Sequence, residues 1–401
     1  MRVLVVAATP FFSDRGCHVR IYEELKHLAR LGVQQVICTY HIGRDLPGLD
    51  IRRSLTVPWY KRIDAKPSIH KAYIDILVLL RAFGVCRRFR PEVIHAHTQE
   101  GAMLGILLGR LFRLPVVFDA QSESTATEIT ETYQYTKRRN LLHRTAAWID
   151  RWVPHNSHAV IASSTRIARH YVEVQGLPAD KVSVVLDGAD TEMFHPRFFD
   201  ARVKSELGLP EDSLLIAFVG LLEPHQGIDV LIEAMAHVAQ ATPTAHLLVM
   251  GFPRESEYRA KAEAMGLGHR VTFTGQMDYA RLPRYLAGSD LAVAPKMSPN
   301  ESNGKIYNYI ASGLPVVAFD TEVNREVLGD LGVYAAYGNA TELAAGMLAL
   351  FHNRERRVEL GRAVRRRAEE QFSWQQSAER IMQVYETLKR TRSAQRRGKD
   401  A

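Results

Sequence analysis

The sequence predicts an α/β protein with two Rossmann-like domains that face a cleft, each built on a parallel, doubly wound sheet. Short β-branched runs alternate with helix-length segments along the chain, and this alternation is typical of parallel sheets with crossover helices. The chain has 401 residues, which is too long for one ordinary core. Ligands of such sheets bind outside the carboxyl ends of the strands.

The strand-like runs fall into two series separated by a turn-rich and charged stretch at 187–212. The first series lies at 3–6, 36–38, 93–97, 116–118, 160–162 and 182–186. Helical segments lie between these runs at 21–31, 68–88, 101–112, 137–152 and 166–174. The second series lies at 215–219, 247–250, 271–273, 291–294, 316–319 and 333–334. We therefore predict domains at 1–190 and 191–371, followed by a helix at 374–388 and a disordered basic tail at 390–401.

Composition places the protein among ordinary soluble globular chains. Three cysteines, Cys17, Cys38 and Cys86, form neither a metal-ligand spacing nor a disulfide framework, so we expect a reducing, cytoplasmic compartment and no metal site. The apolar start of the chain is short and lacks a cleavage site, which favours a buried first strand. Since about 18 apolar residues in a row are needed to span a membrane, we expect no span.

The net charge of +8 is uneven, because the first half and the tail are basic and the second half is acidic. A basic first half fits anionic membrane lipid, an anionic substrate or nucleic acid, and a solvated basic surface is the alternative. Aromatic residues are not interleaved on a basic face, so we expect no nucleic-acid partner. The sequence sets no oligomeric state.

The segment 299–320 predicts a loop, a helix, a tight turn and a buried strand. Ser302 or Asn303 is expected to cap the helix, and Gly304 allows close approach of a ligand. A helix start suits a phosphate, and Lys305 adds a full positive charge. Asn308 projects from nearly the same face and is placed to bond a sugar hydroxyl. The alternative is a capped amphipathic helix with a solvated lysine.

Other motifs narrow the chemistry. Neither a GxGxxG after the first strand nor a GxxxxGK[ST] is present, which lowers the expectation of a dehydrogenase or a P-loop enzyme. His95 and His97 alternate on one strand and share a face near its carboxyl end. They are candidates for ligand contact, and polar residues at a strand end are the alternative.

Several segments together resemble the large family of retaining glycosyltransferases with the GT-B fold that use nucleotide-sugar donors. Residues 220–229 stand where the family has a glycine, arginine and lysine loop, and 271–275 match a strand and glycine near the donor base. Residues 308–317 match the end of the family's Glu-x7-Glu signature. Residues 187–190 resemble the interdomain linker, and 371–374 resemble the entry to a helix that crosses back to the first domain.

The resemblance implies that residues 1–190 bind the acceptor, that 191–371 bind the nucleotide-sugar, and that 372–401 form the returning helix and tail. It implies a UDP- or GDP-sugar co-substrate, no cofactor and no metal. The implied acceptor contacts are Arg20, His95 and His97. The implied donor contacts are Gly16, Gly220, His225, Gln226, Gly227, Gly251, Gly275, Met277, Lys296, Asn300, Glu301, Ser302, Asn303, Gly304, Lys305 and Asn308.

The sequence departs from the family at charged positions. The loop arginine and lysine fall on Leu221 and Gln226, and the two signature glutamates fall on Asn300, beside Glu301, and on Asn308. A histidine of the first domain falls on Gln121. Either activity is lost or the charges have moved, and we favour Lys305 as the cation that stabilises the leaving phosphate, with Lys296 second. The predicted catalytic residues are Lys305, Asp119, Gln121 and His18.

A membrane surface is also predicted. The apolar run 72–80 is flanked by basic residues, and the helix at 137–152 mixes basic with aromatic and aliphatic residues. We therefore expect a peripheral protein at the inner face of the cell membrane with a lipid-linked or cell-envelope glycan acceptor. The alternative is that these helices pack on their own sheet. Rival functions are a nucleotide-sugar epimerase and a non-catalytic nucleotide-sugar-binding subunit.

Overall fold

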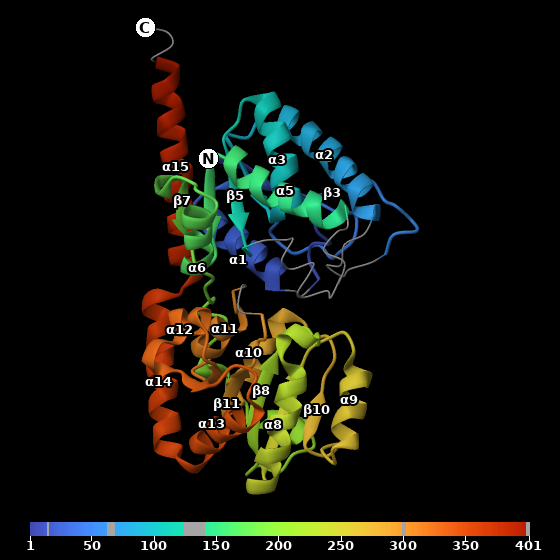
Figure 1. Cartoon of the computed structure of the whole chain (residues 1–401), viewed down its shortest axis with the longest axis vertical. Helices are drawn as coiled ribbons and strands as arrows, with labels where there is room; N and C mark the ends of the chain where they lie inside the picture. The colour runs from blue at the N-terminus through green and yellow to red at the C-terminus, as the bar shows by residue number, and fades with distance from the viewer. Residues whose placement is uncertain (14–15, 62–68, 124–140, 299–301, 398–401) are drawn as a thin grey trace. The chain divides into compact units, whose positions relative to one another are not determined.

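The computed structural model describes residues 1–13, 16–61, 69–123, 141–298 and 302–397, and the structural statements below concern these residues. The chain divides into two compact units (Figure 1). The first consists of Met1–Ser13, Cys17–Leu186 and Trp374–Ala401, and the second of Asp14–Gly16 and Asp187–Ser373. The boundaries predicted at 190 and 371 therefore move to Asp187 and Ser373. Here the two passages of the chain pair, since the Ala189 N–H donates to the Phe372 carbonyl at 2.8 Å.

The first unit contains a seven-stranded parallel sheet in the order β3-β2-β1-β4-β5-β6-β7 among the described residues. Its strands are β1 (Arg2–Ala7), β2 (Gln34–Thr39), β3 (Ile51–Arg53), β4 (Val93–His97), β5 (Val116–Ala120), β6 (Ala159–Ala162) and β7 (Val182–Val184). The structure confirms the runs of the first predicted series and adds β3. That strand escaped the sequence analysis because one isoleucine followed by two arginines carries no apolar pattern.

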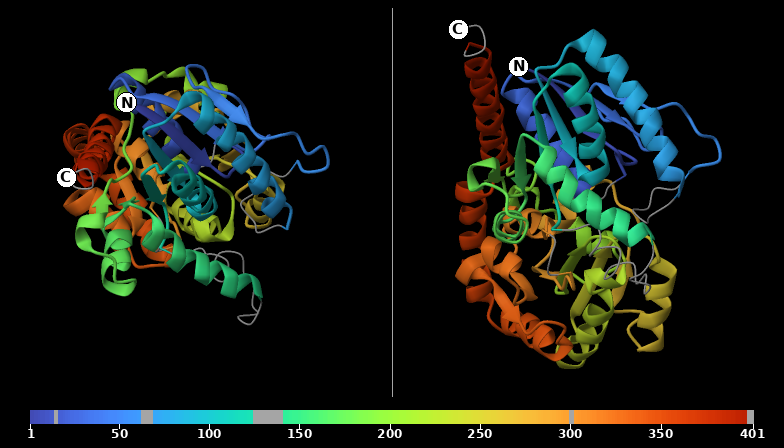
Figure 2. Two further views of the ribbon diagram at one scale, coloured as in Figure 1. Left: turned by 90° about the horizontal axis from the view of Figure 1, so that it is seen from above. Right: turned by 45° about the horizontal axis from the view of Figure 1, so that its top comes forward.

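Helices cover both faces of this sheet, as expected for right-handed crossovers. They are α1 (Gly16–Arg30), α2 (Ile69–Phe89), α3 (Thr98–Phe112), α5 (Leu141–Asn156), α6 (Thr165–Arg169), a π-helical turn (His170–Val174), a 3₁₀ turn (Ala179–Lys181) and α15 (Trp374–Arg397). Neighbouring helices α2, α3 and α5 lie together on one face (Figure 2). Helix α15 runs to Arg397, so the disordered tail predicted from residue 390 is wrong up to that point. The tail has no proline, and its arginine, alanine and glutamine residues favour helix.

The second unit contains a six-stranded parallel sheet in the order β10-β9-β8-β11-β12-β13. Its strands are β8 (Leu214–Val219), β9 (Ala245–Met250), β10 (Val271–Phe273), β11 (Leu291–Ala294), β12 (Val316–Phe319) and β13 (Val333–Ala335). The helices are α7 (Arg202–Glu206), α8 (Ile228–Ala241), α9 (Glu255–Ala264), α10 (Leu282–Ala287), α11 (Lys305–Ala311), α12 (Glu322–Leu328), α13 (Ala340–His352) and α14 (Arg354–Gln371). Short 3₁₀ turns lie at Pro196–Phe198, Pro224–Gln226, Tyr279–Arg281 and Gly329–Leu331. This second predicted series is confirmed.

Each sheet has its own apolar core, because its strands are covered on both faces. Strands β9, β11 and β12 are buried along their whole length. Helix α2 shows how a mostly apolar segment divides its residues. Ile74, Val78 and Ala82 face the core, while Ile76 and Leu80 are more than half exposed. The spacing of four residues between the buried positions matches one face of a helix.

One acidic side chain is built into this core. Asp75 of α2 is buried, and the Tyr40 hydroxyl donates to its Oδ1 at 2.7 Å. Burial, and then the charge of Glu100, raise the pKa of Asp75 to about 7, although the hydrogen bond from Tyr40 opposes the shift. The folded chain therefore keeps a proton here that the unfolded chain loses near pH 4.

The first prediction concerns this carboxyl group. Because the folded state binds the extra proton, the free energy of unfolding falls as pH rises from about 4 to about 7, by at most about 1.4 kcal/mol per pH unit. Asp75→Asn should remove this part of the pH dependence, as measured by denaturant unfolding at a series of pH values. The exposed Asp180→Asn serves as the control. An Asp75→Asn protein that keeps the wild-type slope contradicts the assignment.

Candidate functional site

In the second unit, two loops and the start of a helix meet at the carboxyl edge of the sheet. The loop after β8 carries Gly220 and Gln226, the loop after β11 carries Lys296, and α11 begins at Lys305. Since all paired strands of this sheet run parallel, their carboxyl ends lie at one edge. This edge is where open α/β sheets bind ligands.

Lys305 is held among uncharged groups. Its Nζ donates to Gln226 Oε1 at 2.9 Å and lies 4.3 Å from the centre of the Phe218 ring. In the part of the chain that the structure describes, no carboxylate pairs with it. Burial, and then the charge of Lys296, hold the pKa of the Lys305 ammonium well below its ordinary value. An anion placed beside Nζ would remove this penalty.

Gly220 leaves room for the Lys305 side chain. A Cβ at this position would stand 2.9 Å from Lys305 Nζ, and the residue has φ +150°, a backbone conformation that L side chains rarely adopt. Two other predicted donor-site glycines are required by the backbone itself. A Cβ at Gly227 would lie 1.7 Å from the Pro295 carbonyl oxygen, and one at Gly251 would lie 2.0 Å from the Gly220 oxygen.

The segment before α11 is fixed by side chains rather than by a helix cap. Lys296 is buried and donates to the Ser302 carbonyl at 2.7 Å, while the Ser302 hydroxyl donates to Asp187. Asn303 donates to the Asn324 side chain at 3.0 Å. The predicted cap by Ser302 or Asn303 is therefore wrong, because both side chains are engaged elsewhere. Gly304 precedes the helix with helical dihedrals and no capping side chain.

The remaining predicted donor residues are placed as follows. The half-buried Asn308 has no hydrogen-bond partner for its amide among the described residues, which leaves it open to a ligand. The His225 carbonyl accepts from the Met297 N–H. Gly275 and the half-buried Met277 follow β10, at the same edge of the sheet. Gly16 begins α1, where a Cβ would meet no atom of the described residues within 4 Å. Asn300 and Glu301 lie outside the described residues.

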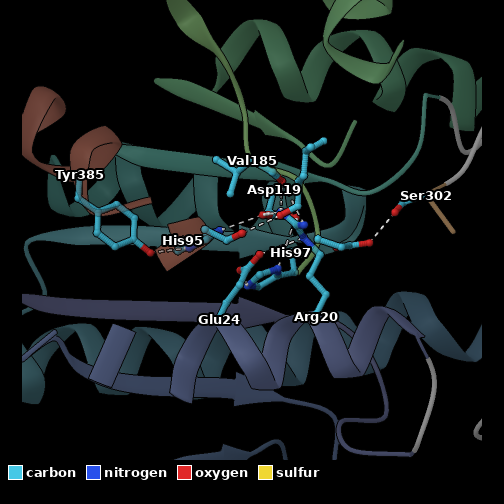
Figure 3. A network of polar contacts seen from close by, with 11 residues as sticks. Arg20, Glu24, His95, His97, Asp119, Val185, Ser302 and Tyr385 are labelled. Atoms are coloured by element: carbon cyan, nitrogen blue, oxygen red, sulfur yellow. Dashed lines mark hydrogen bonds and ion pairs between the residues drawn. The ribbon is translucent and has the colours of Figure 1, made fainter. Parts of the chain in front are cut away.

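The first unit contains a buried charge network centred on Arg20 of α1 and Asp119 of β5 (Figure 3). Arg20 Nε donates to Asp119 Oδ1 at 3.0 Å, and Nη2 donates to Oδ2 at 2.9 Å. The guanidinium also donates to the Val185 carbonyl and pairs with Glu24 at 2.9 Å. Burial alone would raise the pKa of Asp119, but the Arg20 charge outweighs burial and holds it below its ordinary value.

Two histidines and a tyrosine extend this network. His95 and His97 stack with ring centroids 4.5 Å apart. The Tyr385 hydroxyl of α15 lies 2.5 Å from His95 Nδ1, and burial, with the charges of Glu24 and Asp119, raises the pKa of this tyrosine. A hydroxyl that stays protonated donates to Nδ1, so His95 Nε2 carries the ring proton and faces Asp119 Oδ2 at 3.6 Å. Burial, and then His95, lower the pKa of His97.

This geometry corrects three predicted contacts. Arg20, His95 and His97 are at most 3% exposed, so they are enclosed by the protein rather than open to an acceptor. Asp119 is fully buried, and both of its oxygens are held by Arg20, which leaves no face for attack on a substrate. Together with Glu24, the two histidines and Asp119 lie close enough to ligate a metal ion. Arg20 instead supplies the positive charge, so we interpret the cluster as an ion-pair network.

His18 and Gln121, both predicted to be catalytic, differ in their surroundings. His18 is fully buried, accepts from the Ser13 N–H at its Nδ1, and contacts the Thr9 hydroxyl through Nε2 at 2.7 Å. It therefore fixes the loop after β1, which corrects its catalytic assignment. The half-buried Gln121 follows β5, and its Nε2 has no hydrogen-bond partner among the described residues. Its predicted catalytic contact stays a prediction.

Sequence reasoning missed two features of these sites. Gln226 was expected to touch the donor, whereas the structure uses it to orient Lys305. Tyr385 was not singled out, because a tyrosine on a polar helix carries no signal for a partner almost 300 residues away. Tyr385 and His95 are 290 residues apart in the sequence, and only the tertiary fold brings them into contact.

Comparison with known proteins gives consistent results over both units. Residues 200–367 match the family described as glycosyl transferases group 1, and residues 15–188 match the glycosyl transferase 4-like domain. The chain is 27% identical to a D-inositol 3-phosphate glycosyltransferase of Thermomonospora curvata, over 94% of this chain and 92% of that protein. It is 26% identical to a phosphatidyl-myo-inositol mannosyltransferase of Mycobacterium leprae, over 84% and 82% of the two chains.

Solved structures share the fold. A sucrose-phosphate synthase of Thermosynechococcus elongatus superposes with a TM-score of 0.82 at 19% identity, covering 98% of this chain and all of that one. An Anabaena protein in complex with UDP-glucose gives a TM-score of 0.76 at 17% identity, covering 96% and 100%. At these sequence identities the similarity establishes the fold alone, and the function has to be argued from the site residues of this chain.

The second prediction concerns the buried ion pair. Arg20→Met leaves Asp119 as an uncompensated buried charge and should lower the free energy of unfolding by about 3–5 kcal/mol. Adding Asp119→Asn to that variant removes the charge and should recover part of the loss. The exposed Arg87→Met should stay within about 0.5 kcal/mol of wild type. Denaturant unfolding measures all three, and a double variant less stable than Arg20→Met alone contradicts this account.

Proposed function

Because the chain belongs to the group 1 glycosyltransferases with the GT-B fold, we propose that it transfers a sugar from a UDP- or GDP-sugar to a lipid-linked acceptor, with retention and without a metal. The observation that carries the donor assignment is Lys305. It is a basic side chain without a carboxylate partner in the described residues, placed beside Lys296 at the carboxyl edge of the second sheet. A diphosphate is the ligand that suits two neighbouring ammonium groups.

In this proposal, Lys305 stabilises the charge that builds on the diphosphate as the sugar leaves. Gln226 holds Nζ in place, so the cation does not have to be reorganised during the reaction. Asn308, whose amide is unengaged in the described residues, supplies hydrogen bonds to the ribose or the sugar. It replaces the family's glutamate in binding, not in proton transfer, since an amide does not titrate.

Retention requires either a covalent intermediate or attack from the face of the departing diphosphate. Asp119 is the carboxylate predicted at the first sheet, yet Arg20 holds both of its oxygens. A carboxylate used in this way does not act as a nucleophile. We therefore favour same-face attack by the acceptor, assisted by the leaving diphosphate, over a covalent intermediate on Asp119.

An exposed surface on α2, α3 and α5 supports a membrane-bound acceptor. Neighbouring helices there expose large apolar side chains, which are Ile76, Leu80, Phe83, Leu107, Leu111 and Trp148. Exposed arginines lie on the same helices, namely Arg81, Arg87, Arg88, Arg110, Arg144 and Arg151. Apolar side chains with a basic surround suit anionic lipid, and each cation contributes about 1 kcal/mol near such a surface. We call these twelve residues the α2–α5 surface.

Docking through the α2–α5 surface is the mode of membrane contact in this proposal. No described helix has the length and apolar character to cross a bilayer. Docking of this kind would place the protein at the inner face of the cell membrane. The relative named for a phosphatidyl-myo-inositol acceptor is consistent with a lipid-linked substrate. Helix α2 also packs on its sheet, so one helix serves the core on one face and the surface on the other.

The third prediction concerns Lys305. Lys305→Met should slow turnover of UDP-glucose or GDP-mannose by about 10²–10³-fold, because a preorganised charge at the leaving group is lost. The pKa of Lys305 is lowered in the free protein and should rise beside a diphosphate. At a pH between the pKa of the free protein and that of the complex, UDP binding therefore takes up a proton, and the affinity for UDP falls as the pH rises. Calorimetry in buffers of different ionisation enthalpy measures this uptake, which Lys305→Met should abolish.

Lys261→Met is the matched control for Lys305, because its Nζ pairs with Asp229 at 2.7 Å on the surface of α9. It should keep wild-type turnover and proton uptake. Normal turnover and unchanged UDP affinity in Lys305→Met would move the role to Lys296. A wild-type protein that binds UDP-sugar without hydrolysis or transfer is a binding subunit, and one that interconverts two sugars on UDP is an epimerase.

The fourth prediction concerns the α2–α5 surface. The protein should float with vesicles containing phosphatidylglycerol at low salt and detach as salt is raised, because exposed charges are screened. Leu80→Glu and Leu111→Glu should each weaken binding. Val174→Glu changes an even more exposed apolar residue of the same unit outside this surface and should have no effect. Absence of flotation, or flotation that is insensitive to salt, would exclude this mode of docking.

A further inference from the structure

Trp59 is exposed although Val57 and Tyr60, close to it in the sequence, are buried. Its side chain is 74% exposed, the highest value among the large apolar residues that the structure describes. Val57 and Tyr60, on either side, are only 5% and 3% exposed. Two side chains of this segment therefore pack in the core, while the indole between them is presented to solvent.

The orientation of the indole is also fixed. Its Nε1 donates to the Tyr73 hydroxyl at 2.9 Å, and that hydroxyl lies 2.7 Å from Nδ1 of His70. The His70 ring packs against both Tyr73 and Tyr60. Because the only polar atom of the indole is satisfied within the protein, the ring presents its apolar face to a ligand. Polar groups of His70 and Tyr73 lie at its edge.

The segment that carries Trp59 belongs to the carboxyl edge of the first sheet. It follows β3, whose last residue, Arg53, forms hydrogen bonds to the loops after β1 and β2. Arg53 Nη1 donates to the carbonyls of Phe11 at 2.8 Å and Ile42 at 2.9 Å. Trp59 is thus attached to the edge at which a parallel sheet binds its ligand, on the unit expected to hold the acceptor.

We propose that Trp59 is a stacking platform for a sugar or cyclitol ring of the acceptor, an inference that rests on the proposed function. One face of such a ring carries C–H groups that pack on an aromatic face, while its hydroxyls reach polar groups at the rim. Trp148 provides the contrast. Its indole stacks on Trp152 with ring centroids 5.6 Å apart and lies among the arginines of the α2–α5 surface, a setting that suits lipid.

The test uses the full chain labelled with ¹⁵N in its tryptophans. The sequence has four, so four indole N–H signals are expected, and Trp59→Phe identifies that of Trp59. Titration with methyl α-D-mannopyranoside and, separately, with myo-inositol should shift the Trp59 signal and leave that of Trp148 in place. Trp59→Ala should raise the dissociation constant about tenfold. Trp59→Phe keeps a ring and should lose less, and Trp148→Ala is the matched control.

Other outcomes count against the inference or against the proposed function. Equal affinity of Trp59→Ala and wild type, with both folded by thermal melting, removes the platform. A Trp59 signal that moves with phosphatidylglycerol vesicles but with neither ring compound assigns the residue to lipid instead. Binding of UDP and of GDP by wild type is measured separately. If either nucleotide binds and the ring compounds do not, this inference fails while the proposed function stands. If the ring compounds bind and neither nucleotide does, the proposed function is rejected, and Trp59 is then a ring-binding residue that serves no acceptor.

Discussion

The buried pair of Arg20 and Asp119 is the interaction on which the first unit depends. A guanidinium out of water is tolerated only with full compensation, and here it is met by two carboxylates and the carbonyl of Val185. The pair joins α1 to β5, and His95 connects it to Tyr385 on α15. A helix that is distant in sequence is thereby fixed to the sheet by polar contacts whose loss would leave a buried charge.

The basic side chains Arg20 in the first unit and Lys305 in the second differ in how their charge is compensated. In the first, Arg20 is neutralised inside the protein, so its charge serves structure. In the second, Lys305 is held by a neutral amide and an aromatic ring, next to Lys296, and its pKa is depressed. Only the second arrangement leaves an ammonium group whose charge an anionic ligand would compensate. This difference is why we assign the donor diphosphate to the second unit and a structural role to the conspicuous histidines of the first.

Two exposed tryptophans of the first unit, Trp59 and Trp148, have different surroundings. Trp148 belongs to a surface of large apolar side chains and arginines on neighbouring helices. Trp59 stands on a short segment at the carboxyl edge of the sheet, and its indole N–H is satisfied by Tyr73. The chemistry around each ring, rather than its exposure, is our reason for proposing a lipid contact for Trp148 and a sugar contact for Trp59. An acceptor with a lipid tail and a cyclic headgroup would use both.

The sequence alone determined the two parallel sheets and the position of nearly every strand, and it pointed to Lys305, because periodicity and turn residues are local properties of the chain. The three-residue strand β3 carried too little pattern to be found. Only the tertiary structure decided which polar residues are open to a ligand. His18, His95 and His97 resemble catalytic groups in the sequence, yet the structure buries all three. His18 is held by its near neighbours Thr9 and Ser13, whereas His95 is held by Tyr385, which is 290 residues away. Burial and pairing depend on such long-range contacts, and no local pattern encodes them.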